Sequence, residues 1–378
     1  MIQRILITGG AGFIGSRLAL CLLAKGHAVR VLDNLSPQVH GANPEASPLF
    51  RSIQGKVEFL HGSVTNRTDL MKALSGIETV IHLAAETGTG QSMYAIRHYT
   101  DVNIGGTALL LDLIANESFP VRKIVVASSR AVYGEGKYWC RDHGSVFPVG
   151  RFAENMKNGN FEVHCPLCGV PARLAPTDED APVRPASVYG ITKLTQEQMV
   201  LTIGKALRIS ALAFRYQNVY GPGQSLSNPY TGILSIFSTR IRNGGCINIF
   251  EDGKESRDFV FIDDVVAATI SGIESEASLV DVFNVGSGVA IDVSTIANGL
   301  QRMLGQTVPV RVSGQFRMGD IRHSLADLTK VRALLGFEPA VTMEEGLRRF
   351  VSWVIGEGVQ ADWYEESLRE LETKGLLK

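Results

Sequence analysis

Three glycines near the start of the chain constrain its fold more than any other feature. Gly9, Gly12 and Gly15 directly follow a short β-branched run and open a segment with helical spacing. Glycines there let the backbone turn tightly between a strand and a helix, so that a pyrophosphate can rest on the helix N-terminus. The motif therefore predicts a dinucleotide-binding βαβ unit, in which Phe13 and Ile14 also contact the cofactor.

An aspartate at the end of the next predicted strand indicates which dinucleotide binds. Asp33 stands 18 residues after Gly15, close to the ~20 expected of a carboxylate that binds ribose hydroxyls. Because a carboxylate there would repel a 2′-phosphate, the sequence favours NAD over NADP, with Asn34 in the same site. The alternative is a glycine turn followed by an ordinary aspartate at a strand end.

Short apolar runs alternate with longer helical patterns along the first part of the chain. Strands are expected at residues 5–8, 28–33, 57–61, 79–83, 123–128 and 209–215, and helices at 13–25, 68–74, 102–116 and 189–204. This alternation is typical of βαβ units, so the predicted fold class is α/β, with a Rossmann-type doubly wound parallel sheet. Residues 134–181 interrupt the pattern and show no regular period.

Composition excludes several classes of protein. A formal net charge of -1 gives no overall field to attract nucleic acid or an acidic membrane. No apolar run approaches the roughly 20 residues of a membrane span, and the strand expected at residues 5–8 leaves no room for a signal peptide. Five cysteines are too few for a disulfide framework in 378 residues, so we expect a cytoplasmic protein.

A second group of residues suggests proton transfer. Tyr189 and Lys193 lie four residues apart at the start of a predicted helix, on one face. A neighbouring ammonium and a positive nicotinamide ring would favour the phenolate, so we expect the pKa of Tyr189 to move from about 10 toward neutrality. Tyr189 would then take a proton from a sugar hydroxyl, with Ser129 hydrogen-bonded to the same oxygen. A solvated helix face is the alternative for the Tyr/Lys pair alone.

Together these motifs resemble the extended short-chain dehydrogenase/reductases, in the NAD-dependent sugar epimerase/dehydratase family. The resemblance covers almost the whole chain. It rests on Gly9-x-x-Gly12-x-x-Gly15, His82-Leu-Ala-Ala85, Asn103-x-x-Gly106-Thr107, Ser128-Ser129-x-x-Val132-Tyr133-Gly134, Tyr189-x-x-x-Lys193, Arg215-x-x-Asn218-x-Tyr220-Gly221-Pro222, Arg257-Asp258-Phe259, Asn284-Val-Gly286 and Arg317-x-Gly319-Asp320.

The resemblance implies roles for further residues. Additional NAD contacts are expected at Ser63, Val64, Leu83, Ala84, Ala85 and Asn103. The nucleotide sugar is expected to meet Thr87, Ser129, Asn218, Arg257, Arg317 and Asp320, and also the segment 227–232. Guanidinium groups match phosphate geometry, which supports a diphosphate site at the two arginines. The family usually carries an acidic residue where this chain has Ser63, whose hydroxyl can still hydrogen-bond adenine.

The residues after Ser129 narrow the reaction. Dehydratases of the family resemble Thr-Asp-Glu here and use the carboxyls as acid and base, whereas this chain reads Ser129-Arg130-Ala131. A decarboxylase would usually keep a glutamate at Ala131, and reductases of the family more often use NADPH. This leaves an NAD-dependent nucleotide-sugar 4-epimerase, which oxidises C4 transiently and returns hydride to the other face. The alternatives are an NAD-dependent 4-ketoreductase, a UDP-sugar 4-epimerase and a non-catalytic dinucleotide sensor.

An insertion separates Ser129 from Tyr189. Within it, Cys140-x-x-His143 and Cys165-x-x-Cys168 have the spacing of a structural Cys₃His zinc knuckle, with His164 as an alternative to His143. A loop with reduced cysteines and a redox-active pair are the other interpretations. Together with residues 32–40, the insertion resembles the branch that contains dTDP-L-rhamnose 4-epimerases. That branch implies conversion of dTDP-L-rhamnose to dTDP-6-deoxy-L-talose for surface polysaccharides.

The expected organisation has two domains. Residues 1–215 form the NAD-binding Rossmann domain, interrupted by the insertion at 136–181. Residues 216–378 form a smaller mixed α/β domain for the nucleotide sugar, with part of 258–272 returning to the first domain. By analogy with the family we expect a homodimer formed through the helices near 103–116 and 189–204.

Overall fold

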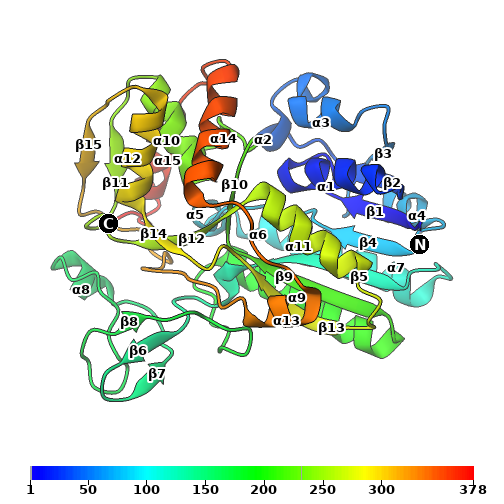
Figure 1. Cartoon of the computed structure of the whole chain (residues 1–378), viewed down its shortest axis with the longest axis horizontal. Helices are drawn as coiled ribbons and strands as arrows, with labels where there is room; N and C mark the ends of the chain where they lie inside the picture. The colour runs from blue at the N-terminus through cyan, green and yellow to red at the C-terminus, as the bar shows by residue number, and fades with distance from the viewer. Residues whose placement is uncertain (1, 231) are drawn as a thin grey trace.

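The computed structural model describes residues 2–230 and 232–378, and its largest element is a seven-stranded parallel sheet (Figure 1). The strand order is β13-β9-β5-β4-β1-β2-β3. The strands are β1 (Arg4–Thr8), β2 (Ala28–Asp33), β3 (Glu58–His61), β4 (Thr79–His82), β5 (Lys123–Ser129), β9 (Ser210–Tyr216) and β13 (Val280–Val285). The order reverses between β1 and β4, and ligands of such sheets bind at this point, beyond the carboxyl ends of the strands.

Helices cover both faces of the sheet because successive side chains of its central strands point in opposite directions. In β1, Ile5 and Ile7 join one apolar core with α1 and α11, whereas Leu6 joins a second core with α4, α7 and α9. These helices are α1 (Phe13–Ala24), α11 (Ile262–Glu274), α4 (Arg67–Leu74), α7 (Gly106–Asn116) and α9 (Val188–Leu207). No helix in the described part of the chain is long and apolar enough to cross a membrane.

The six strands predicted from the sequence are confirmed, each within two residues of its expected ends. The seventh, β13, was not expected, and it pairs in parallel with β9 along its whole length. The helix predicted at 102–116 is present, but a π-helix at Thr100–Gly105 precedes α7. Missing β13 is understandable, because it follows α11 in a region where short strands and loops obscure the alternation.

Smaller sheets and four helices form the C-terminal part. One sheet has the order β10-β12-β14 and the other pairs β11 with β15. The strands are β10 (Asn218–Tyr220), β11 (Ile247–Ile249), β12 (Ser256–Phe261), β14 (Ala290–Asp292) and β15 (Val310–Val312), and the helices are α10 (Ile233–Arg242), α12 (Val293–Leu304), α14 (Met343–Gly356) and α15 (Tyr364–Thr373). Between these elements the chain returns to the large sheet as α11 and β13, a longer segment than residues 258–272.

Short helical segments carry much of the remaining chain. They are α2 (Pro37–His40), η1 (Pro44–Ala46), α3 (Pro48–Ile53), α5 (Thr89–Ser92), α6 (Ile96–Tyr99), η3 (Arg130–Val132) and α13 (Thr329–Leu335). Several of them directly follow strands of the large sheet. Their side chains are therefore held near the strand ends at which a ligand would bind.

The insertion forms a small lobe of its own, seen at the lower left of Figure 1. Its three antiparallel strands, in the order β7-β6-β8, are β6 (Tyr138–Cys140), β7 (Gly144–Val146) and β8 (Arg173–Leu174). The short helix α8 (Ala153–Lys157) lies between β7 and β8 in the chain. Tyr138, Val146 and Val163 form a small buried core together with Cys140 and Cys165. Strands this short have too few side chains to show a period, which explains why the sequence indicated irregular chain.

A network of charges, centred on buried arginines, joins this lobe to the C-terminal part; we call it the insertion clamp. Its members are Arg151, Arg322, Glu135, Glu162, Glu251 and Asp252. Arg151 pairs with Glu135 at 3.1 Å and with Glu251 at 2.8 Å. Arg322, whose side chain is fully buried, pairs with Glu251 at 2.9 Å, with Asp252 at 2.6 Å and with Glu162 at 2.7 Å. The clamp therefore fixes the lobe against the segments 251–252 and 320–322.

Candidate active site

A cleft of about 570 Å³ lies at the carboxyl ends of the sheet strands, between them and the C-terminal part. The structure brings almost every predicted cofactor and substrate residue to this one cleft. They are Gly9, Gly12, Phe13, Ile14, Gly15, Asp33, Asn34, Ser63, Val64, Leu83, Ala84, Ala85, Thr87, Ser129, Tyr189, Lys193, Asn218, Arg257, Arg317 and Asp320. The cleft is therefore the candidate active site.

The glycine loop needs glycine for reasons visible in its packing. Gly9 has a positive φ of 68°, and a Cβ there would lie 2.7 Å from the backbone nitrogen of Ala84. A Cβ on Gly15 would lie 2.4 Å from the carbonyl oxygen of Gly9. The loop thus brings bare backbone to the N-terminus of α1, as a site for a pyrophosphate requires.

Asp33 is held in place by backbone amides of the same site. Its carboxylate accepts hydrogen bonds from the backbone N–H of Ala11 at 2.9 Å and of Leu35 at 2.8 Å. His40 Nε2 lies 4.0 Å away, and burial lowers the pKa of His40. The carboxylate is fixed at the cleft wall and keeps lone pairs for ligand hydroxyls.

Ser63 lies at the cleft edge beyond β3. Its backbone N–H donates to Asp69 Oδ2 at 3.0 Å, and its hydroxyl is 2.8 Å from the hydroxyl of Thr65. Asp69 thus supplies a carboxylate to this turn, although it is not among the cleft-lining residues. The Ser63 hydroxyl remains able to hydrogen-bond a ligand.

Asn103 is the one predicted NAD contact that the structure does not place on the cleft wall. It is fully buried, and its side-chain amide donates to the Glu86 carbonyl at 3.1 Å and to the Thr192 hydroxyl at 2.9 Å. Its carbonyl oxygen accepts from the Glu86 N–H at 2.8 Å. The side chain therefore holds the loop after β4 against α9, and the expected contact of Asn103 with NAD stays a prediction.

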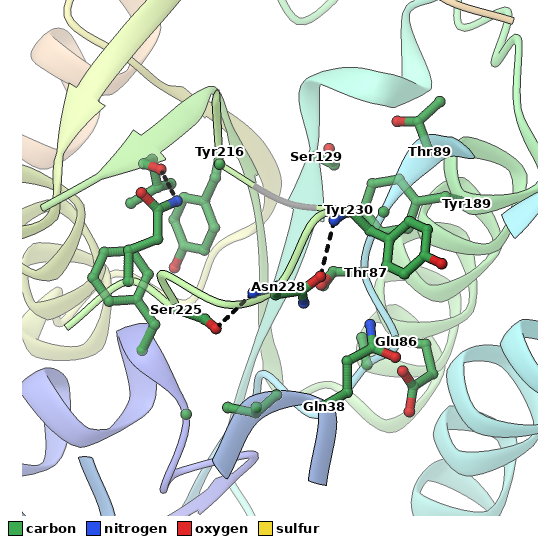
Figure 2. Close-up of a pocket in the computed structure, with 18 of the residues that line it drawn as sticks. Gln38, Glu86, Thr87, Thr89, Ser129, Tyr189, Tyr216, Ser225, Asn228 and Tyr230 are labelled. Atoms are coloured by element: carbon green, nitrogen blue, oxygen red, sulfur yellow. Dashed lines mark hydrogen bonds between the residues drawn. The ribbon is translucent and has the colours of Figure 1, made fainter. Parts of the chain in front are cut away.

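Ser129, Tyr189 and Lys193 meet at one end of the cleft. Lys193 donates to the carbonyl of Ala127 at 3.0 Å, and its Nζ lies 6.0 Å from the centre of the Tyr189 ring. Figure 2 shows Ser129 and Tyr189 in the same pocket as Thr87 and Thr89. A hydroxyl, a phenol and an amine thus stand where β5 ends and α9 begins.

Burial has the largest effect on the pKa values at this end of the cleft. Burial raises the pKa of Tyr189, while the Ser129 hydroxyl and the charge of Arg130 oppose that rise. Burial also lowers the pKa of Lys193 to about 7. Burial thus outweighs the charges of the neighbouring side chains, and the expected shift of Tyr189 toward neutrality, which includes the charge of the nicotinamide ring, stays a prediction.

Two arginines and one aspartate stand further along the cleft. Asp320 pairs with Arg257 at 3.0 Å and with Arg317 at 2.6 Å, and their charges hold its pKa well below its usual range. The Arg317 guanidinium lies over the ring of Phe250 at 4.9 Å. Asp320 thus fixes both guanidinium groups within the cleft, although 42% of the Arg317 side chain remains exposed.

A loop crosses the same cleft after β10. Asn228 N–H donates to the Ser225 hydroxyl, and Tyr230 N–H donates to Asn228 Oδ1, as the dashed lines of Figure 2 show. Asn228, Tyr230 and Gly232 line the cleft, in keeping with the expectation for segment 227–232, whereas Thr231 lies outside the described residues.

Arg130 and Glu255 are two of the cleft residues that the reasoning from sequence missed. Arg130 donates from Nε to Asn218 Oδ1 at 2.9 Å. Glu255 lies close to Arg257, and burial raises its pKa to about 7. No motif marks either residue, although the position of Arg130 directly after Ser129 could have pointed to the cleft. The arginines of the cleft, Arg130, Arg257 and Arg317, are called the cleft arginines below.

The insertion brings its four predicted metal ligands together, away from the cleft. Cys140 Sγ is 3.6 Å from His143 Nδ1 and 3.7 Å from Cys168 Sγ, and Cys165 Sγ is 3.6 Å from His143 Nδ1. Ligand atoms of a tetrahedral zinc with bonds of about 2.0–2.3 Å are separated by roughly 3.5–3.8 Å. His164 instead lies next to Asn160 and is not in the group. The donor set and its spacing therefore fit zinc.

Comparison with known proteins places this geometry in context. A family model described as the NAD dependent epimerase/dehydratase family matches residues 5–151 and 165–286. A dTDP-L-rhamnose 4-epimerase of Burkholderia thailandensis is 38% identical over 94% of this chain and 96% of its own length. A UDP-glucose 4-epimerase of Mycolicibacterium smegmatis is 32% identical over 93% of this chain and 98% of its own.

Solved structures agree with the sequence comparison. UDP-glucuronic acid 4-epimerase from Bacillus cereus, in complex with UDP-glucuronic acid and NAD, is 26% identical with a TM-score of 0.75, covering 93% of this chain and 99% of that one. UDP-glucose 4-epimerase from Thermotoga maritima, with UDP-glucose, is 28% identical with a TM-score of 0.73 and the same coverage.

Proposed function

The chain belongs to the NAD-dependent epimerase/dehydratase family and is a nucleotide-sugar 4-epimerase, and on that premise we propose that it converts dTDP-L-rhamnose to dTDP-6-deoxy-L-talose. The observation that carries the proposal is the meeting of Ser129, Tyr189 and Lys193 with the glycine loop and the cleft arginines in one cleft. The identity of 38% to a dTDP-L-rhamnose 4-epimerase over nearly the full length supports the substrate.

The chain's own residues divide the work of epimerisation. Tyr189 removes the proton of the C4 hydroxyl, and Ser129 hydrogen-bonds the same oxygen. Lys193, held by the Ala127 carbonyl, stays beside the phenol and stabilises the phenolate. The bound cofactor would supply hydride acceptance at C4 and its return. Because the net reaction is redox-neutral, the site would not need to release NAD between turnovers, and we expect it to be tightly bound.

The remaining cleft residues bind and orient NAD and the nucleotide sugar. Asp33 binds the adenosine ribose of NAD, and the glycine loop and α1 receive its pyrophosphate. Asn34, Ser63, Val64, Leu83, Ala84 and Ala85 complete the NAD site. Arg257 and Arg317 bind the diphosphate of the sugar nucleotide with Asn218, while Asp320 holds both arginines in place. Thr87 contacts the sugar beside Ser129.

The test is a reaction without added cofactor. The purified protein is incubated with dTDP-L-rhamnose and with a panel of dTDP- and UDP-sugars, and the sugar protons are followed by NMR. A second nucleotide sugar of equal mass, growing to a fixed ratio, is expected from dTDP-L-rhamnose. A response only to UDP-sugars would favour a UDP-sugar 4-epimerase, as the identity to UDP-glucose 4-epimerases suggests. Product only from 4-keto sugars with NADH would indicate a ketoreductase.

In the insertion, Cys140, His143, Cys165 and Cys168 hold a structural zinc ion. The support is the Cys₃His donor set, the ligand separations of 3.6–3.7 Å and the amide of Leu167, which donates to Cys165 Sγ at 3.5 Å. Four protein ligands leave no open position for catalysis. Such an ion would stabilise a lobe whose own apolar core is small.

Metal analysis tests the zinc site. Protein purified without chelator should carry about one zinc per chain, and Cys168→Ser should lose it while Cys246→Ser, at a cysteine outside the group, should keep it. Chelation should lower the unfolding temperature of the wild type and leave Cys168→Ser unchanged. Metal-free wild-type protein with a titratable disulfide would instead support a redox pair.

The assembly and organisation are further parts of the proposal. The chain forms a homodimer through α7 and α9, which lie against each other within one subunit and belong to the family's usual pairing surface. Light scattering after size exclusion measures this directly. Residues 1–215 form the NAD domain and 216–378 the substrate domain, with the protein located in the cytoplasm, in keeping with five free cysteines.

A further inference from the structure

Arg130 lies in the cleft without an acidic partner. It directly follows Ser129 at the carboxyl end of β5, and it lines the cleft together with Asn218 and Arg257. Among residues 2–230 and 232–378, its side chain makes one hydrogen bond, from Nε to Asn218 Oδ1, and no ion pair. A guanidinium has five N–H donors, so most of its donors are left for a ligand.

The charges around Arg130 also call for an anion. Among the described residues, the ion pairs of the three cleft arginines all go to one carboxylate, that of Asp320, and burial raises the pKa of nearby Glu255 to about 7. Burial and the charge of Arg257 lower the pKa of Arg130 to about 10, so it still carries its charge at neutral pH. A cation that is half-buried among like charges is costly unless an anion joins it.

We propose that Arg130 is a further substrate-binding residue, which holds the sugar-bearing phosphate of the nucleotide sugar. This inference rests on the proposed function, because that function places the sugar at Ser129 and Tyr189. The phosphate attached to the sugar must lie nearer to Ser129 than the other phosphate does. Arg130 is the cleft arginine adjacent to Ser129 in the chain, whereas Arg257 and Arg317 come from the C-terminal part.

The contact to Asn218 fits this role. Since Asn218 Oδ1 accepts from Arg130, the amide Nδ2 of Asn218 is left as a donor on the same side of the cleft. Two donors of different kinds can then hold one phosphate. Epimerisation needs such a fixed point, because the sugar must turn to present its other face while its phosphate stays bound.

Nucleotide binding tests the inference. Titration calorimetry compares dTDP with dTMP, and UDP with UMP, on the NAD-loaded wild type, Arg130→Gln and Arg130→Lys. Arg130→Gln should weaken the binding of dTDP about 30-fold, as expected for losing a charge pair. The same change should weaken the binding of dTMP less than about 3-fold, because dTMP lacks the second phosphate. Arg130→Lys should fall between, since it keeps the charge and loses the fork. Arg332→Gln, at an exposed arginine paired with Glu338, is the matched control and should bind like wild type.

Two outcomes would overturn the inference. If Arg130→Gln weakened the binding of dTDP and of dTMP equally, or weakened the binding of neither, Arg130 would not contact the second phosphate. A loss in Arg130→Gln that adds nothing to that of Asn218→Ala would make Arg130 only a positioning residue for Asn218. Failure of the proposed function is distinguishable, since a wild type that epimerises no sugar can still bind dTDP through Arg130.

Discussion

The insertion clamp and the cleft arginines are neighbouring groups of charged side chains with opposite balances of charge. In the clamp, two arginines face four acidic side chains. In the cleft, two of the three arginines share one paired carboxylate, that of Asp320, and burial raises the pKa of nearby Glu255 to about 7. Two hydrogen bonds join the groups: Arg151 donates to the carbonyl of Asp320 at 3.2 Å, and Arg257 donates to the carbonyl of Arg322 at 2.9 Å. Arginines with carboxylate neighbours thus stabilise the fold in one group and are available to bind a ligand in the other.

The pKa directions separate the two groups in the same way. Surrounding carboxylates raise the pKa values of Arg151 and Arg322, so the clamp is complete without a ligand. Arg130 has a lowered pKa because it is buried beside another arginine. Arginines occur in both groups. An excess of positive charge over paired carboxylates therefore distinguishes a binding site from a network that only stabilises the fold.

The largest expected effect comes from removing the proton acceptor, which belongs to neither the insertion clamp nor the cleft arginines. Tyr189→Phe removes the proton acceptor and should reduce turnover by about a thousand-fold or more. Binding of dTDP and the unfolding midpoint should stay near wild type, because the phenol oxygen belongs to neither arginine group. NMR turnover assays and titration calorimetry measure the two properties. Near-normal turnover in this variant would remove Tyr189 from the mechanism.

Breaking the clamp should cost stability. Arg322→Met leaves buried Glu251 with Arg151 as its remaining partner and takes the arginine away from half-buried Asp252, so the free energy of unfolding should fall by roughly 3 kcal/mol. Urea unfolding provides the measurement. Arg332→Met, which breaks an exposed pair, is the control and should cost less than about 1 kcal/mol. An equally small loss for Arg322→Met would mean that the clamp is not a support.

Replacing a cleft arginine should instead weaken the binding of the nucleotide sugar. Arg317→Met should raise the KM for the nucleotide sugar about 30-fold with little change in kcat, because the arginine binds the diphosphate and not C4. Its partly exposed side chain should contribute under about 1 kcal/mol to stability. Steady-state kinetics and urea unfolding decide between the two effects. A stability loss as large as that of Arg322→Met would erase the distinction between the groups.

The smallest effect concerns a buried cation with no acidic partner. Burial lowers the pKa of Lys193 to about 7 from 10.5, so above pH 7 the unfolded chain binds more protons than the folded one. The free energy of unfolding should then rise between pH 7 and 9, by roughly 1–2 kcal/mol. Lys193→Met should flatten this rise, whereas Lys205→Met, on the exposed side of α9, should not. Urea unfolding at three pH values checks the slopes.

Local patterns in the sequence predicted what depends on neighbours along the chain. The glycine loop, the Tyr189/Lys193 pair and the two Cys/His pairs each lie within a few residues. The clamp was invisible because its partners are distant, with Arg322 N–H and Glu135 separated by 187 positions. Arg130 was missed because a lone arginine has no motif, and its meaning depends on the charges that folding gathers around it.

Asn103 shows what a recognised motif leaves open. Its motif was recognised, but whether an amide contacts a ligand or its own protein depends on which atoms remain free. Here the loop after β4 and Thr192 use both ends of the side chain. Sequence thus located the region correctly, whereas the role of the residue followed from burial and hydrogen bonding that only the fold defines.

The late seventh strand has a consequence for the synthesis of this protein. β9 is complete at Tyr216, but its outer partner β13 begins at Val280, after the C-terminal part has started to form. During translation, β9 is therefore an open edge whose seven residues are all buried in the finished protein. Such an edge can pair with other chains. The nascent enzyme thus carries an open apolar edge while residues 217–279 are being made, and a truncation before β13 would leave that edge uncovered.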